Sequence, residues 1–143
     1  MAEKTFNQTF DGYYRDINKE HIPEISAVYF VYTCTYNPNA DTVSIEKLIY
    51  IGESNNIKSR IFNHDRYKDW LKELKNGQTL CFSYTSVDNL YRNRLEAAYI
   101  YKHKPPLNIE YVNNFPFDRT TVISQPQDKT AFISKSFTVD RKD

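Results

Sequence analysis

Continuous runs of apolar and β-branched residues predict three short strands in the first two thirds of the chain. Residues 26–36, SAVYFVYTCTY, are mostly aromatic or β-branched and lead into the turn-forming sequence NPNADT. Residues 47–52, KLIYIG, form a second strand, and residues 79–87, TLCFSYTSV, form a third. Because residues 37–46 join the first two strands, we expect an antiparallel hairpin with an enlarged tip.

Between the second and third strands the pattern becomes helical. Residues 54–77 begin with residue types that cap helices, Ser54 or Asn55, and end at Gly77. Their apolar positions predict two helical pieces with a break near residues 65–67: Ile57, Ile61, Trp70, Leu71 and Leu74.

The last third of the chain contains one further helix and two weaker strands. Residues 88–104 start at Asp88, a good N-cap, and stop at Pro105. Residues 119–125 and 130–139 alternate well enough to predict a C-terminal β-hairpin.

The element order is therefore β-β-α-(α)-β-α. It predicts an α/β (α+β) fold in which a small three-stranded, mainly antiparallel sheet is flanked by helices, with the hairpin added at the C-terminus. We expect one globular domain overall, made of an N-terminal extension (1–25), a central domain (26–110) and a C-terminal extension (111–143).

Composition favours a soluble, cytoplasmic (intracellular) protein. The chain has 143 residues, of which 40% are hydrophobic and 15% aromatic, enough for one core. No apolar run approaches the ~20 residues of a membrane span, and the polar N-terminus does not resemble a signal peptide. Cys34 and Cys81 are isolated in apolar runs far from the histidines, so we expect neither a zinc site nor a disulfide.

Charge is nearly balanced overall but unevenly distributed. The whole chain has a net charge of +1, whereas residues 55–104 carry ten Lys or Arg against five Asp or Glu. This local excess is typical of a surface that binds a polyanion, although two lysine-rich, solvated helix faces would look the same. The candidate DNA-binding residues in this region are Lys58, Arg66, Lys68, Arg92, Arg94, Lys102 and Lys104.

Two sets of polar residues in the predicted helices are candidates for chemistry. Asn56, Arg60 and His64 are spaced i, i+4 and i+8, which places them on one helix face, either as a site or as an ordinary solvated face. Glu96 lies among small apolar residues. It is either the partner of Arg92 in a surface ion pair or a carboxylate that holds Mg²⁺.

Two strand tyrosines and one turn asparagine remain ambiguous from periodicity alone. Tyr29 and Tyr50 are either core aromatics or site residues. Strand alternation predicts that Ile49 and Ile51 face the core together and that Tyr50 points to the other side. Asn108 follows the Pro-Pro turn, where it either caps the turn or serves a site.

In their order along the chain, these segments resemble the GIY-YIG nuclease superfamily. The segments are AVYF (27–30), YIG (50–52), ESNNIKSRIFNH (53–64) and RLEAAYIYKHKPPLN (94–108), and the resemblance covers roughly residues 26–110. It implies a metal-dependent endonuclease that hydrolyses DNA phosphodiester bonds, leaving 5′-phosphate and 3′-hydroxyl ends. It also implies a single Mg²⁺ or Mn²⁺ ion per active site and double-stranded DNA as the partner.

Carried over position by position, the resemblance implies a set of site residues. The catalytic residues would be Tyr29, Tyr50, Arg60, His64 and Glu96, with Glu96 as the metal ligand. The structural or substrate-positioning residues would be Gly52, Asn56 and Asn108.

The chain departs from the family pattern in the first motif and in the hairpin. Ala27 stands where the family has glycine, and Val28 where it has isoleucine. The hairpin tip at residues 37–46 is enlarged, which is similar to the restriction-endonuclease branch and makes this loop a candidate DNA contact. His64 is likewise similar to the histidine of that branch.

The resemblance implies a mechanism in which Tyr29 activates the attacking water. Its phenol ordinarily titrates near pH ~10, so we expect that the metal and Arg60 lower this pKa, or that His64 takes the proton. Tyr50 would orient the water or phosphate. The alternatives are a catalytically inactive GIY-YIG-like DNA-binding module and a protein-interaction domain. Cleavage of both strands would need a homodimer.

Overall fold

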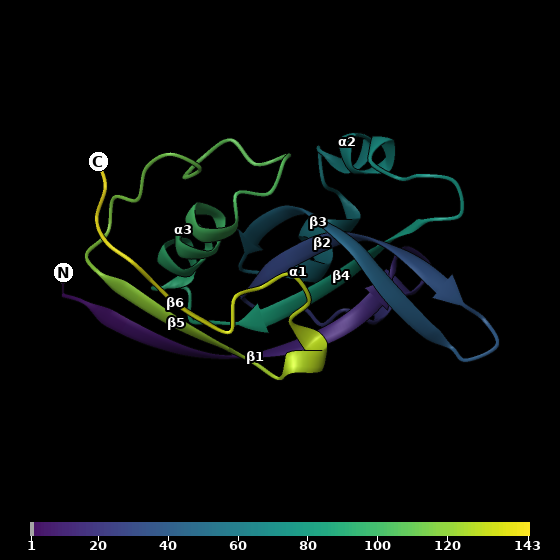
Figure 1. The fold of residues 1–143 in the computed structure, drawn as a ribbon, viewed down its shortest axis with the longest axis horizontal. Helices are drawn as coiled ribbons and strands as arrows, with labels where there is room; N and C mark the ends of the chain where they lie inside the picture. The colour runs from purple at the N-terminus through teal and green to yellow at the C-terminus, as the bar shows by residue number, and fades with distance from the viewer. Residues whose placement is uncertain (1) are drawn as a thin grey trace.

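A computed structural model describes residues 2–143 and contains one six-stranded sheet with short helices around it (Figure 1). The strands are β1 (Lys4–Arg15), β2 (Ala27–Asn37), β3 (Thr42–Ser54), β4 (Thr79–Ser86), β5 (Thr120–Gln125) and β6 (Ser136–Val139). The α-helices are α1 (Ile57–Phe62), α2 (Tyr67–Lys72) and α3 (Arg92–His103), and the 3₁₀ helices are η1 (Asp16–His21) and η2 (Gln127–Lys129).

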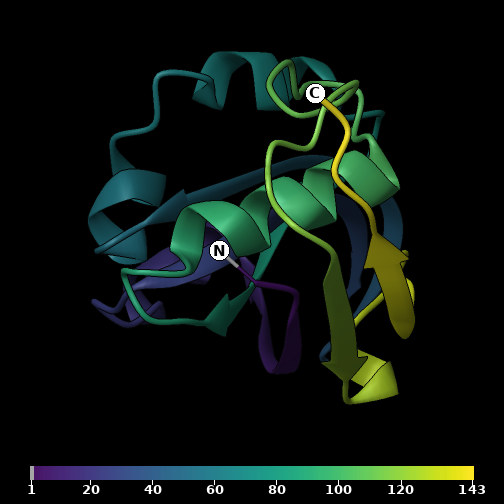
Figure 2. The same ribbon diagram turned by 90° about the vertical axis from the view of Figure 1, so that its left-hand side faces the viewer.

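The predicted three-stranded sheet flanked by helices is wrong. The strands follow the order β3-β2-β4-β1-β5-β6 in one mixed sheet that curls into a half-barrel (Figure 2). All pairs are antiparallel except β1 with β5. Strands from all three predicted segments, 1–25, 26–110 and 111–143, therefore share one sheet.

The strand absent from the prediction is β1, which lies between β4 and β5 near the middle of the sheet. Phe6, Gln8 and Phe10 alternate along it and are all buried. The Gln8 amide donates hydrogen bonds to the Thr85 hydroxyl (2.8 Å) and the Ser86 carbonyl (2.9 Å). A buried amide is tolerated here because its donors find partners on the neighbouring strand.

The β2–β3 hairpin is longer than the sequence predicts, and it extends beyond the other strands in Figure 1. The second strand begins at Thr42 rather than at residue 47, so the turn is short. Residues 37–46 are therefore mostly paired strand and not a loop. Asp41 and Glu46 give this part of the hairpin no excess of positive charge.

Helices cover both faces of the sheet. On one face, α3 packs Leu95 and Tyr99 against Phe30 and the neighbouring strand residues. On the other face, α1 and α2 contribute Ile57 and Trp70 to a cluster with residues of β2, β3 and β4. No helix within residues 2–143 is long and apolar enough to cross a membrane.

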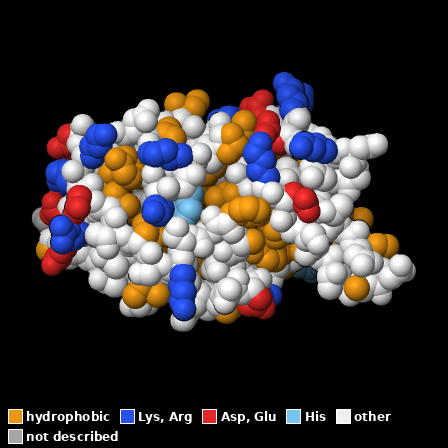
Figure 3. Space-filling view, viewed as in Figure 1, with side chains coloured by type: hydrophobic (Ala, Val, Ile, Leu, Met, Phe, Trp, Pro, Cys, Tyr) orange, Lys and Arg blue, Asp and Glu red, His pale blue; other side chains and the backbone are white. Residues whose placement is uncertain are grey.

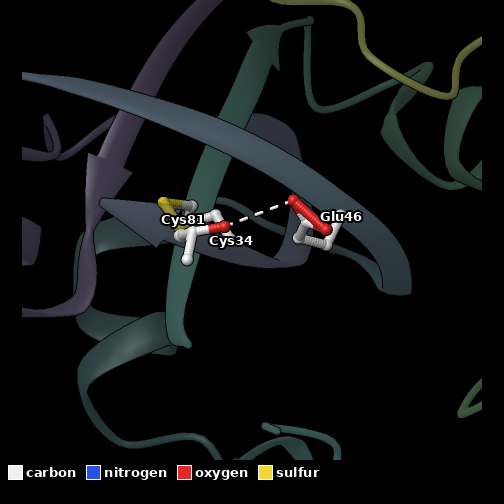
Figure 4. Close-up of a disulfide and its surroundings, with 4 residues drawn as sticks. Cys34, Glu46 and Cys81 are labelled. Carbon is white, nitrogen blue, oxygen red and sulfur yellow. Dashed lines mark hydrogen bonds between the residues drawn. A yellow bond between two sulfur atoms is a disulfide. The ribbon is translucent and has the colours of Figure 1, made fainter. Parts of the chain in front are cut away.

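The two cysteines form a disulfide, so the prediction of two separate thiols is wrong (Figure 4). Cys34 on β2 and Cys81 on β4 are 47 positions apart in sequence, but their Cα atoms are 6.2 Å apart. The two strands are neighbours, with Tyr32 opposite Cys81 and Cys34 opposite Thr79. Spacing along the chain does not reveal this pairing, because the contact depends on the strand order.

Candidate active site

Tyr29 lies at the floor of the candidate site and depends on Gly52 for its position. The two residues are directly opposite each other in the β2–β3 ladder. A Cβ added to Gly52 would lie 2.3 Å from both Cζ and Oη of Tyr29. Because that separation is far below van der Waals contact, only glycine leaves room for the buried tyrosine ring.

Tyr50 lies on the same face as Tyr29, and a β-bulge next to it brings Ile49 to that face as well. Val31 pairs with Tyr50 and Tyr32 pairs with Leu48, so Ile49 is the extra residue. Ile49 and Tyr50 both pack in the cluster that contains Tyr29, whereas Ile51 packs on the opposite face. The prediction that Ile49 and Ile51 face the core together is therefore wrong, since it assumed an unbroken pleat.

His64 contacts Tyr29, although it does not lie on the predicted helix face. Helix α1 ends at Phe62, and His64 belongs to the turn that leads into α2. Its Nε2 is 2.7 Å from the Tyr29 hydroxyl, and its Nδ1 accepts the main-chain N–H of Arg66 at 3.0 Å. The turn thus places the imidazole on Tyr29, a position that helical spacing does not predict.

Burial dominates the titration of this pair. It raises the pKa of Tyr29 well above its usual value. Tyr50 and Glu96 raise that pKa further, and the positive charge of Arg60 opposes them. Burial lowers the pKa of His64 to about 4, with the charge of Arg60 acting in the same direction. Both groups are therefore neutral at pH 7 in the free protein.

Arg60 lies close enough to Tyr29 to affect its titration, but its guanidinium is held by Asp65. Nη2 of Arg60 donates to Oδ1 of Asp65 at 2.9 Å, and the Asp65 side chain is 73% exposed. An exposed ion pair of this kind contributes little to stability and is easily exchanged. The Asp65 carboxylate therefore occupies the anion-binding position at Arg60, a contact that the sequence pattern does not indicate.

Glu96 is a partly buried carboxylate without a partner among residues 2–143. Burial, together with the charges of Glu53 and Glu110, raises its pKa to about 8, and the charge of Arg92 opposes this rise. The alternative of a surface ion pair between Glu96 and Arg92 is not found, because Arg92 Nε donates to Glu53 at 2.5 Å instead. A carboxylate in these surroundings would be stabilised by a bound cation.

The described residues contain no cluster of three or more His, Cys, Asp or Glu side chains able to hold a metal ion. A Mg²⁺ ion needs fewer protein ligands, since it commonly keeps several waters and binds one or two carboxylates together with substrate phosphates. The unpaired Glu96 carboxyl fits that requirement. Its charge raises the pKa of Tyr29 and of Tyr50, which puts all three residues within electrostatic reach of one another.

The two candidate asparagines have structural roles. Asn108 pairs with Ile51 on the edge of β3, accepting its N–H and donating to its carbonyl, both at 2.9 Å. Asn56 caps α1 by accepting the Ser59 N–H at 3.1 Å, a position predicted for Ser54 or Asn55. The first contact fixes the turn after α3 beside the site, and the second fixes the helix that carries Arg60.

Trp70 is a site residue that the sequence did not single out. Its ring centroid lies 4.3 Å from that of His64 and 5.6 Å from that of Tyr50. It is fully buried, and the sequence identified it only as an apolar position of the second helical piece. Trp70 therefore forms the wall that holds the imidazole in place.

The basic candidates differ in their exposure and in the contacts that their side chains already make. Arg94 is buried and donates to Thr120 and to the carbonyls of Ala2, Asp118 and Arg119, so it ties the N-terminus to β5 and cannot reach DNA. Arg66 and Arg92 are engaged by Asp69 and Glu53, and Lys58 is half-buried. The exposed candidates are Lys68, Lys102 and Lys104, of which Lys104 donates to the Val112 carbonyl and lies over the Tyr101 ring.

Basic side chains are spread over the molecular face that carries α2 and α3 (Figure 3). No family model, curated protein or solved structure matches this chain. The GIY-YIG resemblance therefore rests on the residues and on their arrangement. The site brings together Tyr29, Tyr50, Gly52, Arg60 and His64, with Glu96 within electrostatic reach.

Proposed function

We propose that the chain is a divalent-metal-dependent endonuclease of the GIY-YIG type. It would hydrolyse phosphodiester bonds of double-stranded DNA and leave 5′-phosphate and 3′-hydroxyl ends. The observation that carries this proposal is the buried 2.7 Å hydrogen bond between Tyr29 and His64. The charges of Arg60 and Glu96 act on this tyrosine. The reaction requires one cationic side chain and one carboxylate, and these two residues would supply them.

Phosphodiester hydrolysis needs a deprotonated water, neutralisation of the negative charge that develops on the phosphate, and a stabilised leaving oxygen. Tyr29 is the group that would accept the proton of the water. Arg60 would leave Asp65 and donate its planar N–H groups to the non-bridging phosphate oxygens. Tyr50, on the same face, would orient the water or the phosphate.

Glu96 would hold the metal, a single Mg²⁺ or Mn²⁺ ion. A bound divalent cation supplies charge neutralisation at the phosphate and at the leaving oxygen. Because the pKa of Glu96 is about 8, the carboxyl must lose a proton to bind a cation at pH 7. Glu53 lies near enough to raise that pKa. Because Glu53 is paired with Arg92, Glu96 is the carboxylate available to bind the metal.

We further propose an intracellular location, because the substrate is DNA. In a reducing compartment the Cys34–Cys81 disulfide would be open, since disulfides are rare in the cytosol. A single site of this kind cuts one strand, so cleavage of both strands would require two copies of the chain.

The proposal is tested by nicking of supercoiled plasmid in Mg²⁺ and in Mn²⁺, with EDTA as the blank. We expect nicking by the wild-type protein and at least a 100-fold loss in Glu96→Gln. Glu20→Gln is the matched control, because this glutamate on η1 is exposed and pairs with His21 at the surface. Wild-type nicking by Glu96→Gln would show that the metal assignment is wrong.

The same assay separates the two alternatives. An inactive DNA-binding module would shift DNA in a gel without nicking it, even in Mn²⁺. A protein-interaction domain would show no DNA binding that weakens with salt, whereas binding to DNA phosphates weakens steeply as salt rises.

A further inference from the structure

We infer that His64 carries its proton on Nε2 and donates it to the Tyr29 hydroxyl oxygen, so that it stabilises the tyrosine's phenolate rather than removing the tyrosine's proton. This inference rests on the proposed function and assigns His64 as a positioning residue for Tyr29. It decides between the two routes of water activation that the sequence leaves open, which differ in where the tyrosine's proton goes.

The hydrogen bond at the other ring nitrogen determines the tautomer. The main-chain N–H of Arg66 lies 3.0 Å from Nδ1, and a peptide N–H can only donate. Nδ1 must therefore present a lone pair, which excludes both the imidazolium and the Nδ1–H tautomer. A neutral imidazole has one N–H, so Nε2 carries it. At 2.7 Å, the Tyr29 hydroxyl is the acceptor.

The packing prevents the ring from turning over to reverse these roles. The His64 side chain is 0% exposed and lies against Trp70 and Tyr50, with centroid distances of 4.3 and 5.3 Å. A flipped ring would place carbon atoms where both hydrogen bonds are now made. Two buried polar contacts would be lost, and each loss costs about 1–3 kcal/mol.

The charged and titratable groups around His64 also favour its neutral form. Arg60 and Arg66 oppose a second proton, whereas Asp65, 3.5 Å from Nδ1 and exposed to solvent, favours one and is outweighed. Burial is the larger cause of its low pKa. The groups that act on the His64–Tyr29 pair from the surrounding elements are Tyr50 on β3, Arg60 on α1, Asp65 and Arg66 in the turn, and Glu96 on α3.

The proton balance of the reaction follows from this assignment. Tyr29 first releases its own proton to solvent, and its phenolate is held by the His64 N–H and the charge of Arg60. The phenolate then takes a proton from the attacking water while the water oxygen bonds to phosphorus. The bond from phosphorus to the 3′ oxygen breaks, and that oxygen is protonated by solvent. His64 stays neutral throughout.

The first test reads the tautomer directly and does not depend on cleavage. Two-bond ¹H–¹⁵N correlation spectra of the ¹⁵N-labelled protein distinguish a protonated Nε2 from a protonated Nδ1. We expect the Nε2–H form of His64 from pH 6 to pH 9. An Nδ1–H form or an imidazolium at pH 7 would overturn the inference, whether or not the protein cuts DNA.

The second test compares two variants, each of which retains one of the two hydrogen-bonding functions of His64. His64→Gln keeps an N–H donor near the Nε2 position, and His64→Asn keeps an acceptor near Nδ1. We expect His64→Gln to nick plasmid about 10- to 100-fold faster than His64→Asn, the value of one hydrogen bond to a charged oxygen. We also expect the Tyr29 pKa, read from its ¹³Cζ shift, to be lower in His64→Gln.

Equal losses of nicking in the two variants, together with equal Tyr29 titrations, would contradict a donor role. If the wild-type protein does not nick DNA, the proposed function fails. The wild-type tautomer and the Tyr29 titrations would then still decide whether His64 donates to Tyr29.

Discussion

The Tyr29 ring fills the space that a Cβ on Gly52 would occupy, with both Cζ and Oη only 2.3 Å from that position. Gly52→Ala should therefore displace the Tyr29 hydroxyl from His64. Overpacking of a buried site costs about 1–3 kcal/mol, and we expect nicking to fall with it. Urea unfolding and plasmid nicking measure the two effects.

Gly77→Ala is the control for this substitution. Nothing lies within 4 Å of a Cβ at this exposed turn, but its φ of +83° is unfavourable for alanine. It should lose about 1 kcal/mol of stability and retain nicking. Nicking by Gly52→Ala at the rate of Gly77→Ala would show that the position of Tyr29 is unimportant.

Glu96 and His64 should make stability depend on pH in opposite directions. The folded pKa of Glu96, about 8, is above its ordinary value of 4.5, so its contribution is complete below pH 4.5 and is lost as pH rises through 8. The folded pKa of His64, about 4, is below 6.5, so its contribution is complete above pH 6.5 and is lost as pH falls through 4.

Between pH 6.5 and 8, Glu96 makes stability depend on pH, whereas His64 does not. The free energy of unfolding should fall there by up to about 1.4 kcal/mol per pH unit, the value for one proton. Urea titrations should show that Glu96→Gln removes this slope and that His64→Gln leaves it unchanged. A wild-type slope equal to that of Glu96→Gln would contradict the raised pKa.

Arg94 and Lys68 should respond to substitution in opposite ways. Arg94→Met leaves buried carbonyls unpaired, so it should destabilise the protein by about 1–3 kcal/mol without changing the salt dependence of DNA binding. Lys68→Gln should leave stability unchanged and reduce the salt slope of binding by about 1. Urea unfolding and gel shifts at several salt concentrations test both, and the reverse pattern would show that the two residues are misassigned.

The disulfide should stabilise the oxidised protein. Cys34 and Cys81 close a loop with a sequence separation of 47, for which chain entropy predicts about 2–4 kcal/mol. Urea unfolding with and without a reducing agent measures the difference. The Cys34→Ala, Cys81→Ala double variant should be insensitive to the reducing agent. No difference for the wild-type protein would mean that the thiols are not joined.

Local pattern predicted individual elements of this fold but not the sheet they form. Strands near residues 26–36 and 79–87 and the helix near 88–104 follow from apolar runs and capping residues. The apolar pattern does not indicate β1, because Phe6 and Phe10 are separated by polar residues, one of which, Gln8, is buried and hydrogen-bonded. Its pairing with β5 joins residues more than a hundred positions apart, which periodicity cannot indicate.

The candidate site shows the same limit. The residue types were read from the sequence, but the contacts arise from features that break a regular pattern. A bulge brings Ile49 to the face that carries Tyr29 and Tyr50, and the end of α1 at Phe62 places His64 in a turn. Asp65 and Trp70 touch the site only because that turn folds back onto the sheet.

The most direct test of the central claim is the pH dependence of the nicking rate of wild-type protein and of Tyr29→Phe in Mg²⁺. Burial keeps the pKa of Tyr29 well above 10, so the phenolate fraction rises throughout the range from pH 6.5 to 9. We predict a wild-type rate that rises with pH and a loss of about 100-fold or more in Tyr29→Phe. A flat wild-type profile, or nicking by Tyr29→Phe at the wild-type rate, would contradict the assignment of Tyr29 as the base.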